Sequence, residues 1–225
     1  LKTSDTEYSL WKSVGVQAVT QAMSMMKSQS ASPKTGEMIV LTNAGYAEVE
    51  GRSTYACLDG LAQAAGVSRG AHTLIEIHSA WNQPLWFAIY DKNSGLCSYL
   101  QGDPVLLNAA SSESLSSEIF AVKVAENIKA ENLYTASADY AEKFDNKIFG
   151  GNEFRIVTIV NAIEAGAPGY AVRSFEFHDH YCPGVTSGIL MANYVKKFFP
   201  KDSYFVQSIS PWCKEDALLV MINAT

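Results

Sequence analysis

Two histidines and a cysteine lie within five residues of one another near the end of the sequence. His178, His180 and Cys182 come directly before a Pro-Gly pair in a chain of 225 residues. If this segment is an extended strand, the three side chains point to one face, because side chains alternate along a strand. Two imidazoles and a thiolate suit Zn²⁺ and other transition metals, and they do not suit Mg²⁺ or Ca²⁺. The spacing therefore predicts a transition-metal site, most simply for zinc.

A metal with three protein ligands has an open coordination position or takes a fourth ligand from elsewhere in the chain. Cys213 is the best candidate for that ligand, because it follows a second apolar stretch, residues 204–209, in the same half of the sequence. Cys57 is the next candidate, and Cys97 is expected to lie in the core. Four cysteines in all are equally compatible with two disulfides or with four free thiols.

The segment after Cys182 reads as an apolar helix, residues 184–199, with Pro183 suited to its first turn. Cys182 would then lie at the helix N-terminus, where unpaired N–H groups and the helix dipole stabilise a thiolate. Gly184 and Gly188 leave one face of this helix bare, so a ligand or a neighbouring backbone can approach closely.

The same residues support two other functions. One is a haem or other cofactor-binding module, with a histidine or cysteine as axial ligand and aromatic walls from Phe175, Phe177 and Trp212. The other is a thiol enzyme, with Cys182 as nucleophile and His180 as base. His78 is expected to be a core or edge histidine on a strand. The sequence assigns no catalytic residue for metal chemistry and no substrate.

The hydrophobic periodicity and the turn signals predict helices, buried strands and loops. The expected helices are 11–27, 58–65, 118–147 and 184–199, and the expected strands are 38–42, 73–80, 84–91, 96–101 and 173–182. Residues 154–163 are expected to be a strand that runs into a helix or turn. The strands between residues 73 and 101 are expected to form an antiparallel meander, because short turn sequences separate them. The fold class is therefore α+β, with an antiparallel sheet and helices.

Composition limits the partners of the chain. Lys and Arg total 17 against 23 Asp and Glu, for a net charge of −6, which argues against a broad nucleic-acid surface. No window approaches eighteen consecutive apolar residues, so no membrane span is expected. The low charged fraction of 18% and the many Ser, Thr, Asn and Tyr residues favour an extracytoplasmic location over a cytoplasmic one.

The run His-Asp-His-Tyr-Cys-Pro-Gly at 178–184, followed by an apolar helix that contains glycine, resembles the FmdE-like family, which is the family of the E component of formylmethanofuran dehydrogenase. That family shows His-Gly-His-x-Cys-Pro-Gly, so Asp179 stands here in place of a glycine. The segment 212–217 resembles the family's cysteine and Asp-Ala helix start, and 90–95 resembles its Tyr-Asp-x-x-x-Gly turn. The resemblance implies an α+β core across most of the chain and a link to the one-carbon metabolism of methanogens. It does not imply the dehydrogenase itself, whose redox cofactors need more than four cysteines.

The resemblance also suggests an internal repeat. Residues 13–16 match 182–185, and 56–61 parallel 212–218. We therefore expect two degenerate FmdE-like copies packed as a pseudo-dimer, residues 1–104 and residues 105–225. In the first copy, the three ligand positions hold Ser9, Trp11 and Ser13, so only the second copy carries the metal motif. The expected partners are therefore a metal ion and, in a homo-oligomer, a second copy of the chain.

Overall fold

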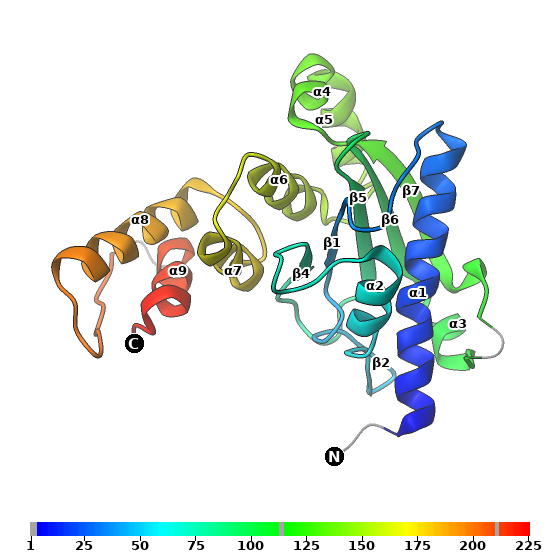
Figure 1. Cartoon of the computed structure of the whole chain (residues 1–225), viewed down its shortest axis with the longest axis horizontal. Helices are drawn as coiled ribbons and strands as arrows, with labels where there is room; N and C mark the ends of the chain where they lie inside the picture. The colour runs from blue at the N-terminus through cyan, green and yellow to red at the C-terminus, as the bar shows by residue number, and fades with distance from the viewer. Residues whose placement is uncertain (1–3, 113–114, 210–211) are drawn as a thin grey trace. The chain divides into compact units, whose positions relative to one another are not determined.

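The chain folds into two compact units, residues 1–153 and 154–225. The computed structural model describes residues 4–112, 115–209 and 212–225 and contains helices together with a mixed β-sheet (Figure 1). The α+β class is therefore confirmed. The boundary between the units lies after Glu153, whereas the sequence suggested one after Pro104. The difference arises because the strand that follows Pro104 pairs into the sheet of the first unit.

The first unit is built on a five-stranded sheet in the order β4-β1-β5-β6-β7. These strands are β4 (Leu74–Glu76), β1 (Met38–Thr42), β5 (Trp86–Asp91), β6 (Leu96–Gly102) and β7 (Phe120–Asn127). A separate two-stranded sheet joins β2 (Glu48–Val49) to β3 (Arg52–Ser53). The pairs β1–β5, β5–β6 and β6–β7 are antiparallel, and the β5–β6 hairpin is the part of the predicted meander that is confirmed.

The expectation of a wholly antiparallel sheet is wrong at one position. Strand β4 pairs in parallel with β1, with Leu41 opposite Ile75, and does not form a meander with β5. The connection from β1 to β4 contains helix α2 (Cys57–Ala65), and a crossover of this length is what a parallel pair requires. The sheet is therefore mixed.

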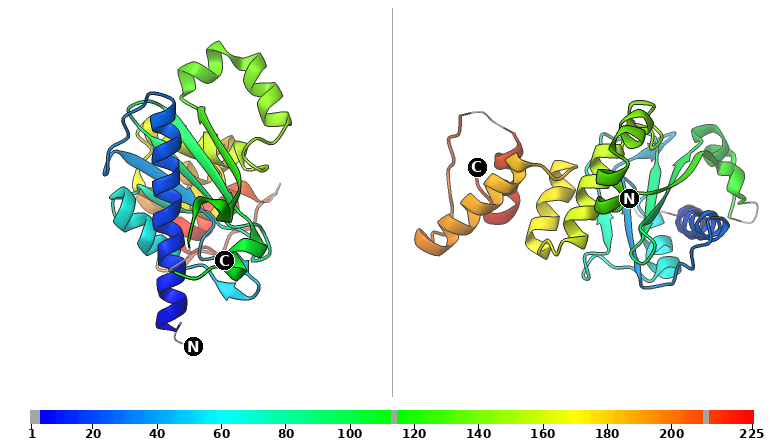
Figure 2. Two further views of the ribbon diagram at one scale, coloured as in Figure 1. Left: turned by 90° about the vertical axis from the view of Figure 1, so that its right-hand side faces the viewer. Right: turned by 90° about the horizontal axis from the view of Figure 1, so that it is seen from above.

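Helix α1 (Asp5–Ser28) lies against one face of the sheet, where it contacts β5, β6 and β7 (Figure 2). The side chain of Ser4 caps its N-terminus by accepting the N–H of Glu7 at 3.2 Å. Its buried face consists of Leu10, Trp11, Val14, Gly15, Ala18, Val19, Ala22 and Met26. This spacing confirms the predicted amphipathic helix.

The segment expected to be helical at 118–147 begins with the 3₁₀ turn Ser117–Ile119 and strand β7. Consecutive residues of β7 lie opposite β6, with Val122 against Gln101 and Val124 against Tyr99. Apolar residues at Ile119, Val122, Ala125 and Ile128 fit a helical spacing, but β-sheet pairing outweighs it here. The remaining helices of this unit are α3 (Pro104–Ala109), α4 (Ala130–Thr135) and α5 (Ser137–Asp145).

The regular elements of the second unit, in its described residues, are all helices. They are α6 (Glu153–Glu164), α7 (Gly169–His178), α8 (Pro183–Phe198) and α9 (Cys213–Ile222), and only the first residue of α6 belongs to the first unit. The strand expected at the start of 154–163 and the strand expected at 173–182 are therefore wrong. Their β-branched and aromatic residues favour strands, yet the buried positions fall one helical turn apart, as Ile156 and Val160 show. Helix α8 is confirmed and packs against α9.

Candidate metal centre

His178, His180 and Cys182 come together where α7 ends and α8 begins. One ligand atom of each side chain lies within 4.8 Å of the other two. The two imidazole rings have centroids 4.3 Å apart, and the Cys182 Sγ lies 3.8 Å from the His178 Nε2. The predicted convergence is present, but a helix end and a turn produce it, and an extended strand does not.

The turn depends on Asp179, which follows the last residue of α7. Its backbone has φ 70° and ψ −7°, in the left-handed region that favours glycine and tolerates aspartate. This conformation stops the helix and reverses the chain before His180. The N–H of Tyr181 donates to the Thr158 Oγ1 at 3.1 Å and ties the turn to α6.

Cys182 occupies the N-cap of α8, as the sequence predicted. Its Sγ accepts the N–H of Val185 at 3.5 Å, and Pro183 is the first residue of the helix. The unpaired N–H groups of the first turn and the helix dipole favour negative charge on this sulfur. The position therefore suits a thiolate ligand or a thiolate nucleophile.

His178 is held by a carboxylate from α9. Its Nδ1 donates to the Asp216 Oδ2 at 2.7 Å, and its side chain is only 9% exposed. An ionised carboxylate can only accept, so in the neutral imidazole this hydrogen bond places the proton on Nδ1 and leaves the lone pair on Nε2. Nε2 is the atom that faces the Cys182 sulfur. A carboxylate–imidazole pair of this kind orients metal-binding histidines.

His180 has a carboxylate partner of its own. Its Nδ1 donates to the Asp179 Oδ1 at 2.6 Å, while the other oxygen of Asp179 accepts the Arg155 Nη2 at 2.7 Å. The ring also contacts Phe154, with centroids 5.1 Å apart. In both histidines Nδ1 contacts a carboxylate, so Nε2 is the nitrogen without a carboxylate partner.

Cys213, the predicted fourth ligand, is the first residue of α9 and lies beside Cys182. A Cβ added at Gly184 would lie 2.5 Å from the Cβ and 3.0 Å from the Sγ of Cys213, so only glycine admits it here. The pKa of the Cys213 thiol is raised, first by burial and then by the hydrogen bond with Cys182. Cys213 lies outside the three-residue group, yet its sulfur is a neighbour of the Cys182 sulfur.

A family model described as "FmdE, Molybdenum formylmethanofuran dehydrogenase operon" matches residues 177–225. Residues 177–225 are therefore similar to this family. The match begins just before His178 and includes Cys182, Cys213 and Asp216, so the resemblance inferred from the motif is confirmed for this segment. It does not extend to the first unit, for which an FmdE-like ancestry stays a prediction. No curated protein and no solved structure is significantly similar to the chain.

Other candidate residues lie outside the FmdE-like cluster. Cys57 and Cys97 are fully buried in the first unit, where burial raises the pKa of both thiols and keeps them protonated. His78 is exposed and meets the ring of Tyr46 edge-on. Of the aromatic residues expected to wall a tetrapyrrole, Phe175 is buried and Trp212 is 76% exposed.

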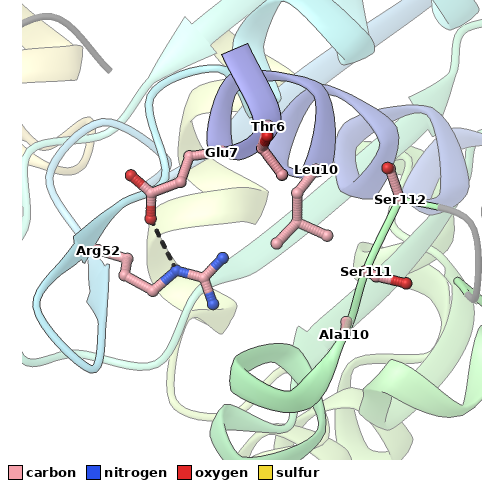
Figure 3. A pocket seen from close by; sticks show the side chains of 7 residues that line it. All are labelled: Thr6, Glu7, Leu10, Arg52, Ala110, Ser111 and Ser112. Carbon is pink, nitrogen blue, oxygen red and sulfur yellow. Dashed lines mark hydrogen bonds and ion pairs between the residues drawn. The ribbon is translucent and has the colours of Figure 1, made fainter. Parts of the chain in front are cut away.

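A cavity of about 290 Å³ lies in the first unit (Figure 3). Its lining is Thr6, Glu7, Leu10, Arg52, Ala110, Ser111 and Ser112, and it includes no residue of the FmdE-like segment. The Arg52 Nε donates to the Glu7 Oε1 at 3.0 Å, so the one cationic group of the lining is already neutralised (Figure 3). Within the described residues, no helix is both long and apolar enough to span a membrane.

Three residues that contact the histidines or Asp179 were not predicted from the sequence. Asp216 was identified only as the start of a helix, and Arg155 and Phe154 were assigned to a strand. Asp179, which stands at the glycine position of the motif, is the residue that ends α7. The one signal for Asp216 was its place three residues after Cys213, which puts both in the first turn of α9.

Proposed function

We propose that the second unit binds a transition-metal ion, most suitably zinc, through His178, His180 and Cys182, with Cys213 as the fourth ligand. The observation that supports this most strongly is the pair of carboxylate contacts at the two Nδ1 atoms. In neutral imidazoles these contacts leave a lone pair on each Nε2, and the Nε2 of His178 lies 3.8 Å from a sulfur at a helix N-terminus. A donor set of two imidazoles and two thiolates is a common tetrahedral zinc set.

Each residue of the site has its own role in binding the ion. His178 and His180 supply neutral nitrogen donors whose orientation Asp216 and Asp179 set. Cys182 supplies a thiolate that the α8 N-terminus stabilises. A bound metal would act as a Lewis acid if one coordination position stayed open, and as a structural centre if Cys213 closed it. No general base is assigned.

Substitution of Co²⁺ for Zn²⁺ tests the site directly. We expect the purified chain, freed of metal with a chelator, to bind one Co²⁺ with sulfur-to-cobalt charge-transfer absorption. Cys182→Ser should weaken binding strongly and remove much of that absorption, and Cys213→Ser should remove the rest. Ser98→Ala, in the sheet of the first unit, should change neither. Absence of stoichiometric Co²⁺ and Zn²⁺ binding would contradict the proposal, and a Soret band in the untreated protein would indicate haem.

A thiol enzyme is the second candidate, because the Cys182 Sγ lies 3.8 Å from the His178 Nε2. His178, rather than the expected His180, is therefore the imidazole positioned to accept the thiol proton. Alkylation with iodoacetamide separates the two functions. A metal thiolate reacts slowly until a chelator removes the ion, whereas a catalytic thiol reacts at the same rate with or without the chelator.

We also infer that the helix pairs α1–α2 and α8–α9 are the two copies of a repeat. In each pair a glycine of the long helix meets the cysteine that starts the short one. A Cβ at Gly15 would lie 2.3 Å from the Cys57 carbonyl oxygen, and Gly184 is similarly crowded by Cys213.

The aspartate contacts add to this likeness. Asp59 of α2 accepts the Tyr8 hydroxyl at 2.8 Å, and Asp216 of α9 accepts His178 at 2.7 Å. The positions that correspond to the ligands, Ser9, Trp11 and Ser13, lie inside the continuous helix α1. The first copy would then keep the helix pair and lack the turn that gathers donors. Superposition of the two pairs in a crystal structure tests this inference.

A further inference from the structure

The two oxygens of Asp179 make separate contacts. Oδ1 accepts the His180 Nδ1 at 2.6 Å, and Oδ2 accepts the Arg155 Nη2 at 2.7 Å. The side chains of Asp179 and His180 are 26% and 24% exposed, so the chain shields most of this pair from water. A carboxylate that is fixed at one oxygen by a guanidinium has little freedom to turn the other away from the imidazole.

The backbone at this position does not require a side chain. Asp179 has φ 70°, a conformation that glycine adopts without strain and that an L-residue adopts at some cost. The motif that this segment resembles has glycine at the same place. A carboxylate here is therefore explained by what it contacts, and those contacts are His180 and Arg155.

The other histidine gives an internal comparison. His178 receives its carboxylate from Asp216, which lies 38 residues away on another helix. His180 receives its carboxylate from the residue directly before it, with Arg155 of α6 as the anchor. Both imidazoles therefore contact a carboxylate, one from a distant helix and one from the neighbouring residue. Outer carboxylates of this kind raise the basicity of the imidazole and fix its tautomer and ring direction.

We propose that Asp179, anchored by Arg155, is a positioning residue that directs the Nε2 of His180 at the metal. The inference rests on the proposed function, because it concerns the same ion. Asp179 does not touch the metal in this scheme; it acts through His180 alone. Loss of Asp179 should therefore weaken metal binding only while His180 is present.

A double-mutant cycle on the full-length chain tests this, with Co²⁺ as the probe. The proteins are the wild type, Asp179→Gly, His180→Ala and the double variant, each titrated with Co²⁺ and followed by visible absorption. Asp179→Gly should lower Co²⁺ affinity roughly 10- to 100-fold, the range that outer-shell substitutions give. In the His180→Ala background the same substitution should change affinity less than about twofold, because no imidazole remains to be positioned.

Further variants separate positioning from folding. Asp179→Asn keeps a residue that tolerates the left-handed backbone and removes the charge, so its affinity should fall between those of the wild type and Asp179→Gly. Arg155→Lys should lower Co²⁺ affinity less than Asp179→Gly does, because Arg155 contacts the carboxylate and not the imidazole. Asp202→Asn, which removes a carboxylate from an exposed part of the same unit, is the control and should bind as the wild type does.

The outcomes are distinct. If the wild type binds no Co²⁺, the proposed function fails, and this inference fails with it. If the wild type binds and Asp179→Gly binds equally well, the inference alone is overturned. An equal loss from Asp179→Gly with and without His180 also overturns it, because the effect would then be structural. A loss confined to the background that retains His180 supports the inference.

Discussion

At the scale of single residues, the site is defined by which nitrogen of each imidazole carries the proton. The carboxylates of Asp216 and Asp179 each accept from an Nδ1 atom, so in the neutral imidazoles both Nε2 atoms carry lone pairs. Without those two contacts each histidine would sample both tautomers and several ring orientations. Under the proposed function, these two contacts orient the imidazoles before an ion binds and so lower the ordering cost of binding.

Asp216→Asn provides a residue-scale prediction. The amide keeps the size of the side chain but removes the charge that holds His178, which is 9% exposed and has little access to replacement water. We expect Zn²⁺ affinity to fall roughly 10- to 100-fold. Competition with a chromophoric chelator measures the change, and Asp202→Asn is the matched control. Unchanged affinity would show that Asp216 does not act on the metal through His178.

At the scale of helices and strands, close contact between two helices positions the second half of the site. A Cβ at Gly188 would lie 2.4 Å from the Lys214 carbonyl oxygen and 2.8 Å from the Ala217 Cβ. Together with Gly184, this glycine lets α9 approach the first turn of α8. The approach brings Cys213 beside Cys182 and Asp216 beside His178.

Gly188→Ala tests this role of the helix contact. The added methyl group meets backbone as well as a side chain, so α9 must shift, and we expect a loss of about 1–3 kcal/mol in the free energy of unfolding. Metal affinity should fall as well, because the shift separates Asp216 from His178. Thermal denaturation and Co²⁺ titration measure the two effects. Gly70→Ala is the control, since an added Cβ there meets nothing within 4 Å.

The sequence predicted some elements well for physical reasons. Helices α1 and α8 were found because their apolar residues repeat with helical spacing, and β1, β5 and β6 because short apolar runs lie between turn residues. Helices α6 and α7 were missed because residues such as Val157 and Phe177 favour strands when read locally. Their helical form is set by tertiary packing, which a local pattern does not contain.

The candidate site was predicted partly for the wrong reason. The donors His178, His180 and Cys182 were placed together by strand alternation, and they come together through the left-handed turn at Asp179. The N-cap position of Cys182 was predicted correctly from the proline that follows it. The contacts of Asp216 and Arg155 join segments distant in sequence, so no local pattern reveals them.

At the scale of the whole molecule, the chain consists of two compact units with different roles. The first contains the mixed sheet with α1 and α2, and its two cysteines are buried in the core. The second contains every proposed ligand and every carboxylate that orients one. Metal binding should therefore stabilise the second unit and leave the stability of the first unit unchanged.

Hydrogen–deuterium exchange on the full chain tests this division. Zn²⁺ binding should slow amide exchange in α7, α8 and α9, because an ion that binds only the folded state stabilises it by mass action. Exchange in β1, β5 and β6 should stay the same, since the first unit supplies no ligand. Equal slowing in both units would contradict the division, and protein kept in a chelator is the reference state.

The short spacing of the donors has a consequence for how the centre is made. His178, His180 and Cys182 are separated by single residues, so gathering them closes only a very small loop and the entropic cost of closure is low. During synthesis these three groups emerge from the ribosome well before Cys213 and Asp216. Under the proposed function, the nascent chain can bind an ion through His178, His180 and Cys182 alone. Helix α9 then adds Cys213 as a ligand and Asp216 as the partner of His178.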